Sequence, residues 1–220
     1  MKGILFDFDG TLADTMEGHY LAWQMALGEY GISIEAYDYY PLEGAGLHEI
    51  ARTFIKDRSW KDSKIEELVI KKKKYYVELQ TVTFYPGVES LVAELKAMEI
   101  PIAIVTAGHL DQLCLTVPQS FLSNFNALVT GDMVSRSKPD PEPYITGALK
   151  LGLKVEDCIA VENAPLGIQS AHHANIFCIG ICSTVGPKEL AQADEIVNRF
   201  EDLRGTNVIK KILNAGRSYA

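Results

Sequence analysis

The sequence predicts an α/β fold: a Rossmann-like parallel sheet flanked by helices, with a small helical cap inserted into it. Short apolar runs recur along the chain, and they are continuous rather than alternating, which is typical of strands covered on both faces. Helical repeats separate most of these runs. One long interval near the N-terminus contains helical repeats alone, which indicates an inserted helical unit.

Several apolar runs are the expected strands of the sheet. They span residues 4–6, 102–105, 127–129, 158–161, 176–181 and 196–197. An apolar repeat from Leu91 to Met98 predicts a helix before the second run. A similar repeat from Tyr144 to Leu149 predicts another helix, which ends before Gly152, a typical C-terminal stop.

The interval between Thr15 and Thr83 is expected to be helical. Asp14 followed by Glu17 resembles a capping box, which predicts a helix that begins here and ends near Gly31. A second helix is expected over 65–79, and we interpret its lysine run, residues 71–74, as a solvated helix face. The chain thus divides into a core of residues 1–14 and 84–220 and a cap of residues 15–83, with linkers near 14–16 and 81–86 that permit a hinge.

The composition indicates an ordinary globular protein. The chain has 220 residues, of which 47% are hydrophobic and 23% charged, and a net charge of −8 at pH 7. This acidic balance opposes binding to nucleic acids and anionic membranes, which favour a surplus of Lys and Arg. The sequence contains no recognisable signal peptide and no apolar run of about 18 residues, and its dispersed cysteines are expected to be reduced packing residues. We therefore expect a cytoplasmic protein, a monomer or a weak homodimer, without nucleic-acid or membrane partners.

Acidic side chains follow two of the expected strands, at the sheet edge where ligands bind in such folds. Asp7 and Asp9 end the first strand, and Glu162 ends the fourth. Because Asp7 and Asp9 are two positions apart, their side chains point to the same side of an extended chain. Carboxylates that face one crevice repel each other unless a hard cation lies among them, and oxygen ligands without clustered His or Cys suit Mg²⁺. The sequence therefore predicts a magnesium site.

Other polar residues are expected at the same edge of the sheet. Thr106-Ala107-Gly108-His109 follows the second strand, and Lys138 lies in the loop after the third. The ammonium group of Lys138 would offset the charge of the acids. Gly10 lets the backbone turn tightly after Asp9. His109 lies where it could contact a substrate, and a surface hydrogen-bonding role is the equal alternative.

Asp7-Phe8-Asp9-Gly10-Thr11-Leu12 resembles the D-x-D-G-T-L signature of the haloacid dehalogenase-like (HAD) hydrolase superfamily. Thr106, which closes the apolar run 102–105, resembles the second motif of that superfamily. Lys138-Pro139-Asp140-Pro141 resembles the third motif, and the stretch from Val161 to Ile168 resembles the acidic fourth. The motifs occur in the family's order, and the helical insertion resembles the small α-helical cap of the phosphatase and β-phosphoglucomutase-like branch.

The resemblance implies phosphoryl transfer through an aspartyl-phosphate. Asp7 would be the nucleophile, and Asp9 would act as general acid and then as general base. Thr106 and Lys138 would hold the phosphoryl oxygens. Mg²⁺ would be held by the Asp7 carboxylate, the Asp9 backbone carbonyl and the Glu162-Asn163 pair.

The resemblance also indicates where a substrate would lie. The expected substrate-binding residues are Gly10, Ala107, Gly108 and His109 in the core and Gly46 and His48 in the cap loop. One departure concerns the metal: many family members with this cap carry Glu-Asp where this chain has Glu162-Asn163. An amide oxygen still coordinates Mg²⁺, but the site loses one negative charge, so we expect either weaker metal binding or a larger share of the coordination for Glu162.

We expect a Mg²⁺-dependent phosphatase that acts on a small phosphorylated metabolite, such as a sugar phosphate, a phosphoglycolate-like acid or a nucleotide. A sugar phosphomutase of the β-phosphoglucomutase type is the alternative, although Leu47 stands where that branch usually carries Arg. A noncatalytic protein that binds a phosphorylated ligand is a further alternative, and the complete set of Asp7, Asp9 and Lys138 argues against it.

Overall fold

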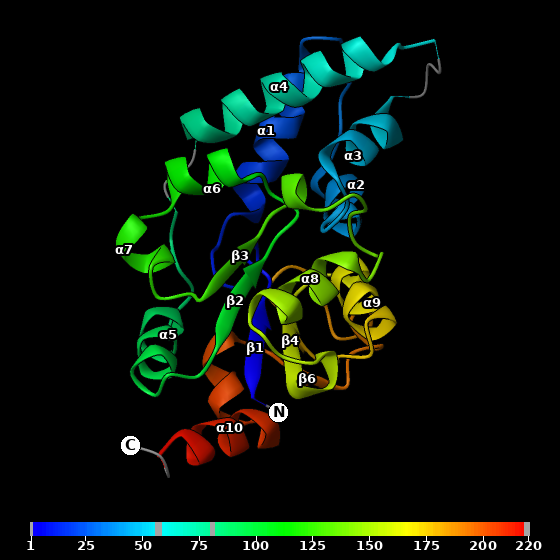
Figure 1. The fold of residues 1–220 in the computed structure, drawn as a ribbon. Helices are drawn as coiled ribbons and strands as arrows, with labels where there is room; N and C mark the ends of the chain where they lie inside the picture. The colour runs from blue at the N-terminus through cyan, green and yellow to red at the C-terminus, as the bar shows by residue number, and fades with distance from the viewer. Residues whose placement is uncertain (1, 56–58, 80–81, 218–220) are drawn as a thin grey trace.

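The computed structural model describes residues 2–55, 59–79 and 82–217 of the chain. It is an α/β fold whose parallel sheet carries a helical insert near the N-terminus, as predicted from the sequence (Figure 1). No helix in these ranges is both long enough and apolar enough to span a bilayer.

All strand pairings of the sheet are parallel, and the strand order is β3-β2-β1-β4-β5-β6. The strands are β1 Gly3–Phe6, β2 Ile102–Val105, β3 Ala127–Val129, β4 Cys158–Glu162, β5 Phe177–Ile181 and β6 Glu195–Val197. These bounds match the predicted apolar runs to within one residue at either end. Strand β1 lies in the middle of the sheet between β2 and β4, so its carboxyl end is flanked by the ends of both neighbours.

Helices cover both faces of the sheet, which explains why the strands are continuously apolar. One face, which carries Ile4 and Phe6, packs against α5 and α10, and the other, which carries Leu5, packs against α8 and α9. The core helices are α5 Val88–Ala97, α6 Leu110–Thr116, α7 Gln119–Leu122, α8 Glu142–Lys150, α9 Pro165–His173 and α10 Asn207–Arg217, with the 3₁₀ turns η2 Gly131–Met133, η3 Val155–Asp157 and η4 Phe200–Gly205.

The insert packs above the carboxyl end of the sheet around its own hydrophobic core (Figure 1). Its elements are α1 Met16–Gly28, α2 Ala36–Tyr39, η1 Tyr40–Leu42, α3 Leu47–Phe54 and α4 Asp62–Leu79. Trp23 and Leu27 of α1 pack with Leu68 of α4, and all three side chains are fully buried. The helical character predicted for this interval is thus found in its described residues.

Two chain segments join the insert to the core side by side. Ala13 and Phe84 form an antiparallel bridge, and the backbone N–H of Asp14 donates to the carbonyl of Thr83 at 2.8 Å. Residues 80–81, which include the start of the second predicted linker, lie outside the described residues. We propose this paired segment as the joint of a cap that spans residues 15–83.

The predicted capping box at Asp14 and Glu17 is not formed. Helix α1 begins at Met16 with Thr15 as its N-cap residue, and no side chain caps it. The Thr15 hydroxyl instead donates to Asp9 Oδ1 at 2.7 Å, and Asp14 accepts a hydrogen bond from Tyr85. The side chain of the N-cap residue Thr15 therefore bonds to Asp9 at the carboxyl end of the sheet instead of capping α1.

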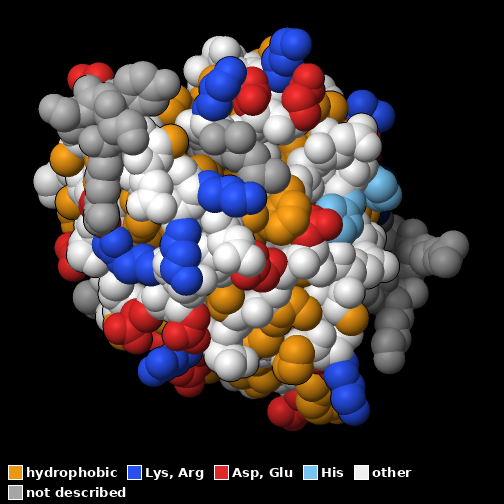
Figure 2. Space-filling model, turned by 90° about the horizontal axis from the view of Figure 1, so that it is seen from below, with side chains coloured by type: hydrophobic (Ala, Val, Ile, Leu, Met, Phe, Trp, Pro, Cys, Tyr) orange, Lys and Arg blue, Asp and Glu red, His pale blue; other side chains and the backbone are white. Residues whose placement is uncertain are grey.

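Charges are interspersed on the face of the core that lies opposite the insert. Figure 2 shows Lys and Arg side chains beside Asp and Glu side chains, with hydrophobic side chains scattered between them. All four cysteines are free thiols, of which Cys158 and Cys178 are buried in the core and Cys114 is exposed.

Candidate active site

Asp7, Lys138 and Glu162 meet where β1 and β4 end. Lys138 Nζ lies 2.7 Å from Asp7 Oδ1, 2.6 Å from Glu162 Oε1 and 3.0 Å from the carbonyl oxygen of Val105. All three charged side chains are buried. Lys138 is far from both acids along the chain, and the structure brings the three groups together at the edge of the sheet where the sequence predicted them.

The charges in this group compensate one another. Burial by itself lowers the pKa of Lys138, but the adjacent carboxylates of Asp7 and Glu162 outweigh it and raise that pKa, so Lys138 carries a positive charge. Burial, helped by the charges of Glu162 and Asp9, raises the pKa of Asp7 well above its ordinary value, and the Lys138 ammonium opposes this shift only in part. The ammonium group therefore favours an ionised Asp7 carboxylate in an otherwise unfavourable environment.

Both carboxylate oxygens of Glu162 already have partners. Oε1 accepts hydrogen bonds from Lys138 and, at 2.6 Å, from the hydroxyl of Tyr144, while Oε2 accepts one from the backbone N–H of Asn163. A side chain at Gly167 would collide with the same carboxylate, so α9 approaches it closely only with glycine at that position. Glu162 is thus held beside Lys138, and its place among the metal ligands stays a prediction.

Asp9 lies next to this group and accepts hydrogen bonds from both the core and the cap. Its Oδ1 is bonded to Thr15 at 2.7 Å and to His19 Nε2 at 2.9 Å, and its Oδ2 accepts from the Thr106 hydroxyl at 3.3 Å. Burial raises the pKa of Asp9, but His19, Thr15 and the charge of Lys72 together lower it to about 2. Asp9 is therefore ionised at neutral pH in this arrangement.

The Asp9 contact to His19 continues into helix α4. Lys72 Nζ donates to His19 Nδ1 at 2.7 Å, so the opposite ring nitrogen, Nε2, carries the proton that is donated to Asp9. The His19 ring stacks on Tyr76 with a centroid separation of 4.0 Å. Burial and the Lys72 charge lower the pKa of His19, and burial lowers that of Lys72 to about 8.

The interpretation of residues 71–74 as a solvated face is wrong for one lysine. Lys72 is fully buried, whereas Lys71 and Lys74 pair with acids near the surface. The helical repeat already contained the signal, since Lys72 follows Leu68 by four positions and precedes Tyr76 by four, on the apolar stripe of α4. His19 lies in the same way between Met16 and Trp23 on α1.

The residues around Asn163 fit a magnesium ion. One end of the Asn163 carboxamide lies 3.3 Å from Asp7 Oδ2 and 3.2 Å from the Asp9 carbonyl oxygen, and donation of its NH₂ group to both satisfies the hydrogen bonding. If the amide is turned by 180°, its oxygen lies beside Asp7 Oδ2 and the Asp9 carbonyl oxygen, so three oxygen atoms then face one point. Among the described residues, neither this place nor any other brings together three His, Cys, Asp or Glu side chains that could hold a metal ion. Asp7, the Asp9 carbonyl and Asn163 are thus a sparse oxygen set, of the kind Mg²⁺ accepts when substrate and water complete its shell.

Asn163→Asp is expected to tighten Mg²⁺ binding, by about tenfold, because a carboxylate replaces an amide beside Asp7 and the Asp9 carbonyl. Isothermal titration of the protein with MgCl₂ measures this dissociation constant without turnover. An unchanged or weaker constant contradicts the place of Asn163 among the ligands. Asn124→Asp, in the turn that follows α7 and far from the site along the chain, is the matched control.

Gly10 is required by the same group of residues. Its φ is +81°, and a Cβ atom at this position would lie 2.1 Å from one end of the Asn163 carboxamide. The turn after Asp9 therefore excludes any side chain. This agrees with the expectation that Gly10 allows a tight turn, whereas its contact with substrate remains a prediction.

A small cavity lies between the insert and the core beside Asp9. Its volume is about 20 Å³, enough for one water molecule. It is lined by Asp9, His19, Tyr39, Glu43, Ala45, Leu47, Ile50, Lys72, Ala107, Gly108 and Gln112. A phosphorylated metabolite does not fit this space, so its binding requires the insert to move relative to the sheet.

The structure brings only part of the predicted substrate-binding set to this cavity. Ala107 and Gly108 line it. His109 is half-buried beside it with Nδ1 3.1 Å from Lys73 Nζ, and Gly46 packs against Ser137 of the core. His48 is exposed and is paired with Glu66 on α4 at 2.5 Å, so it is not brought to the cavity. Tyr39, Glu43 and Gln112 are lining residues that sequence reasoning missed.

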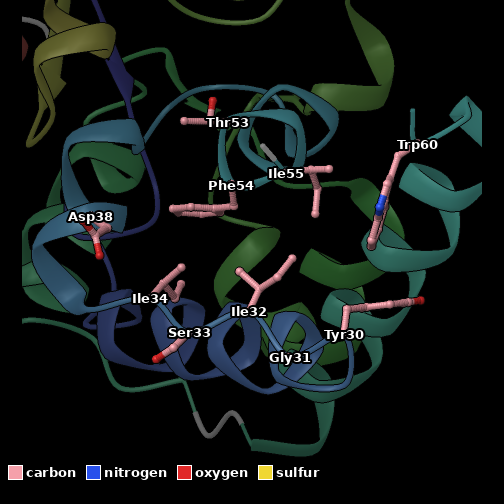
Figure 3. A pocket seen from close by; sticks show the side chains of 10 residues that line it. All are labelled: Tyr30, Gly31, Ile32, Ser33, Ile34, Asp38, Thr53, Phe54, Ile55 and Trp60. Atoms are coloured by element: carbon pink, nitrogen blue, oxygen red, sulfur yellow. The ribbon is translucent and has the colours of Figure 1, made fainter. Parts of the chain in front are cut away.

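A much larger pocket lies elsewhere, within the insert. It measures about 660 Å³, and Figure 3 shows the apolar side chains of Ile32, Ile34, Phe54 and Ile55 on its walls, with Trp60 at one side. It contains none of the buried acids or lysines described above. The chemistry is therefore expected at the end of the sheet and not in this pocket.

Comparisons with known proteins agree with this geometry. The family model described as "Haloacid dehalogenase-like hydrolase" matches residues 4–181. The chain belongs to the haloacid dehalogenase-like hydrolases. Among curated relatives, a validoxylamine A 7'-phosphate phosphatase from Streptomyces hygroscopicus subsp. limoneus is 29% identical over 94% of this chain and 98% of its own.

Two further comparisons define the branch of the family. Hexitol phosphatase A from Escherichia coli is 29% identical over 93% of this chain and 94% of its own. The crystal structure of a β-phosphoglucomutase from Clostridium difficile superposes with a TM-score of 0.83 at 25% identity, over 98% of each chain. The predictions of a HAD-like phosphohydrolase and of this capped branch of the family are thereby confirmed.

Proposed function

We propose that this HAD-like hydrolase is a Mg²⁺-dependent phosphatase that cleaves a small phosphorylated metabolite through a phosphoryl group carried by Asp7. The observation that supports it is the buried contact of Lys138 with Asp7 beside Asp9. A nucleophilic carboxylate, a fixed cation and a second carboxylate within one buried site are the groups that this reaction requires.

In this proposal Asp7 uses Oδ2 to attack phosphorus, because Oδ1 is held by Lys138. Lys138 and the Thr106 hydroxyl hold the phosphoryl oxygens. Asp9, which is ionised before the substrate binds, takes up the proton of the monoanionic phosphate ester and delivers it to the leaving oxygen. Asp9 then takes a proton from the water that cleaves the acyl-phosphate. Mg²⁺, held by Asp7, the Asp9 carbonyl and Asn163, supplies charge neutralisation at the transferring group.

His19 and Lys72 support Asp9 in both steps. His19 holds Asp9 Oδ1 at 2.9 Å, and the Lys72 contact to the other ring nitrogen fixes the tautomer that makes this possible. The insert therefore contributes directly to the proton chemistry of a core carboxylate. We assign both side chains the role of positioning residues for Asp9.

Hydrolysis is favoured over phosphomutase activity by the cap side of the cavity. The place of the arginine that a sugar phosphomutase of this branch usually carries is taken by Leu47, which lines the cavity together with Ala45 and Ile50. These side chains offer no charge to a second phosphate of a bisphosphate intermediate. The names of the two curated phosphatases point to phosphorylated polyols and related cyclic compounds as the substrate class to test first.

The proposal is tested by phosphate release from p-nitrophenyl phosphate and hexitol phosphates with and without MgCl₂, together with a crystal soaked in beryllium fluoride. We expect Mg²⁺-dependent release and a beryllofluoride adduct on an Asp7 oxygen. Isomerisation of a sugar phosphate without net phosphate release would select the phosphomutase. Binding of phosphate esters without either reaction would select a noncatalytic protein.

His19→Phe is expected to lower kcat about a hundredfold and to move the acidic limb of the kcat/KM profile to higher pH. The variant keeps the ring that stacks on Tyr76 but lacks both nitrogens. The pKa of Asp9 is held at about 2 in part by His19, so it rises without His19 and Asp9 loses its ionised form at a higher pH. Initial-rate profiles between pH 4 and 9 measure the shift, and His172→Phe, whose imidazole pairs with Asp194, is the control. An unmoved limb would exclude the role assigned to His19.

A further inference from the structure

We propose that Glu43 and Gln112 form a leaving-group subsite that favours phosphate esters whose alcohol part carries hydroxyl or ammonium donors and disfavours esters with a second anionic group. The inference deepens the proposed function and rests on it, since it concerns the part of the substrate that leaves with the ester oxygen. Glu43 belongs to the cap and Gln112 to α6 of the core, so the subsite is complete only when both sides meet.

Glu43 presents one fixed carboxylate oxygen and one that is available to a ligand. Its Oε2 accepts a hydrogen bond from the buried hydroxyl of Tyr39 at 2.7 Å. Within the described chain, Oε1 has no hydrogen-bond partner, and the side chain lines the cavity beside Asp9. Tyr39 therefore positions the carboxyl group while leaving its second oxygen free to accept a proton donor.

Gln112 supplies a second polar group whose hydrogen-bonding capacity is not used by the protein. Its Oε1 is buried and has no partner among the described residues, although the side chain lines the same cavity. Such an orphaned amide oxygen costs free energy, which a hydroxyl or ammonium donor in the cavity would recover. Glu43 and Gln112 thus both offer acceptors to one space.

The charges around this space act against a second anion. Among the described lining residues, the two carboxyl groups of Asp9 and Glu43 face a single ammonium group, that of Lys72, while the low pKa of His19 keeps it neutral. Burial and the Asp9 charge raise the pKa of Glu43 to about 7 even though Lys72 is near. A ligand carboxylate or phosphate here would add a further negative charge beside Asp9 and Glu43. An ammonium or hydroxyl group would instead donate a hydrogen bond to the buried Glu43 carboxylate and stabilise its charge.

The test compares esters that differ only in the group at the far end of the leaving alcohol. 2-Hydroxyethyl phosphate, phosphoethanolamine and phosphoglycolate share one skeleton and end in a hydroxyl, an ammonium and a carboxylate group. Sorbitol 6-phosphate and 6-phosphogluconate give the same comparison for a longer alcohol. We expect the wild-type protein with Mg²⁺ to show kcat/KM values about tenfold or more higher for the hydroxyl and ammonium esters than for their carboxylate partners.

Glu43→Gln keeps the shape of the side chain and removes its charge. It is expected to reduce the ratio of hydroxyl to carboxylate ester to within about threefold, chiefly by raising kcat/KM for the carboxylate ester. Glu49→Gln makes the same chemical change on the exposed face of α3 and should leave the ratio as it is. Gln112→Leu should lower kcat/KM for the hydroxyl ester while the carboxylate ester is still rejected.

The outcomes separate this inference from the proposed function. Equal kcat/KM values within both wild-type ester sets, or a ratio that Glu43→Gln leaves unchanged, would overturn the subsite, and an unaffected hydroxyl ester in Gln112→Leu would remove Gln112 from it. If no ester, p-nitrophenyl phosphate included, releases phosphate, the proposed function fails. In that case the dissociation constants of the same esters are measured by calorimetry without Mg²⁺. The subsite then predicts tighter binding of the hydroxyl ester than of the carboxylate ester, and equal binding of the two would overturn it.

Discussion

Asp7→Asn is expected to reduce phosphate release from p-nitrophenyl phosphate by at least about a thousandfold, because an amide cannot serve as the nucleophile that accepts the phosphoryl group. The side chain is buried at the end of β1, and its carboxylate is held by Lys138 at 2.7 Å. Initial rates with MgCl₂ measure the loss, and circular dichroism confirms that the variant is folded.

The matched control is Asp14→Asn, which makes the same change in an exposed side chain at the joint of the insert. We expect it to retain the wild-type rate. Turnover by Asp7→Asn within tenfold of the wild-type rate would rule out a phosphoryl group on Asp7 and with it the proposed mechanism.

Lys138→Met is expected to abolish turnover and to destabilise the fold by about 3–5 kcal/mol at pH 7.5, since removal of one partner leaves buried carboxylates uncompensated. Because the Met side chain is similar in length to that of Lys, the substitution removes the charge and changes the packing volume little. Urea unfolding measures the free energy of unfolding. Lys150→Met, at the exposed end of α8, is the control for stability.

The destabilisation should depend on pH in a defined direction. Burial and the Glu162 charge raise the pKa of Asp7 in the folded protein, and the Lys138 ammonium opposes them, so its removal raises this pKa further above that in the unfolded chain. Such a group destabilises the fold above its folded pKa, and the loss is relieved as the pH falls through it. The variant should therefore recover stability relative to wild type between pH 7.5 and pH 5, and a constant difference would contradict this account.

The sheet was predictable because each strand is a short apolar run of its own. Ile4, Leu5 and Phe6 alternate between two buried faces, so both faces had to be apolar, and the sequence states this directly. The place of Asp7, Asp9, Thr106 and Lys138 followed from the rule that the carboxyl ends of parallel strands meet at one edge. These residues converge because the strands that precede them are parallel neighbours in one sheet, and the order of strands and helices along the sequence predicts such a sheet.

The contribution of the insert to the site was not predictable in the same way. The helical repeats place Lys72 and His19 on the buried stripes of α4 and α1, but only the contact between these helices over the end of the sheet turns them toward Asp9. Glu43 and Gln112 come from separate elements whose approach depends on how the insert sits on the core. The orientation of two packed bodies is set by many weak contacts, for which a single sequence carries no periodic signal.

The reactivity of Asp9 in the core depends on where the helical insert lies. Asp9 belongs to the core, but Thr15 and His19, which hold its Oδ1, belong to or adjoin α1 of the insert. Movement about the paired segments at Ala13 and Phe84 would withdraw both partners, so the Asp9 carboxylate would no longer be held in position while the site is open to bulk water. A compound too large to be enclosed would then bind without being consumed, and so act as an inhibitor rather than a poor substrate.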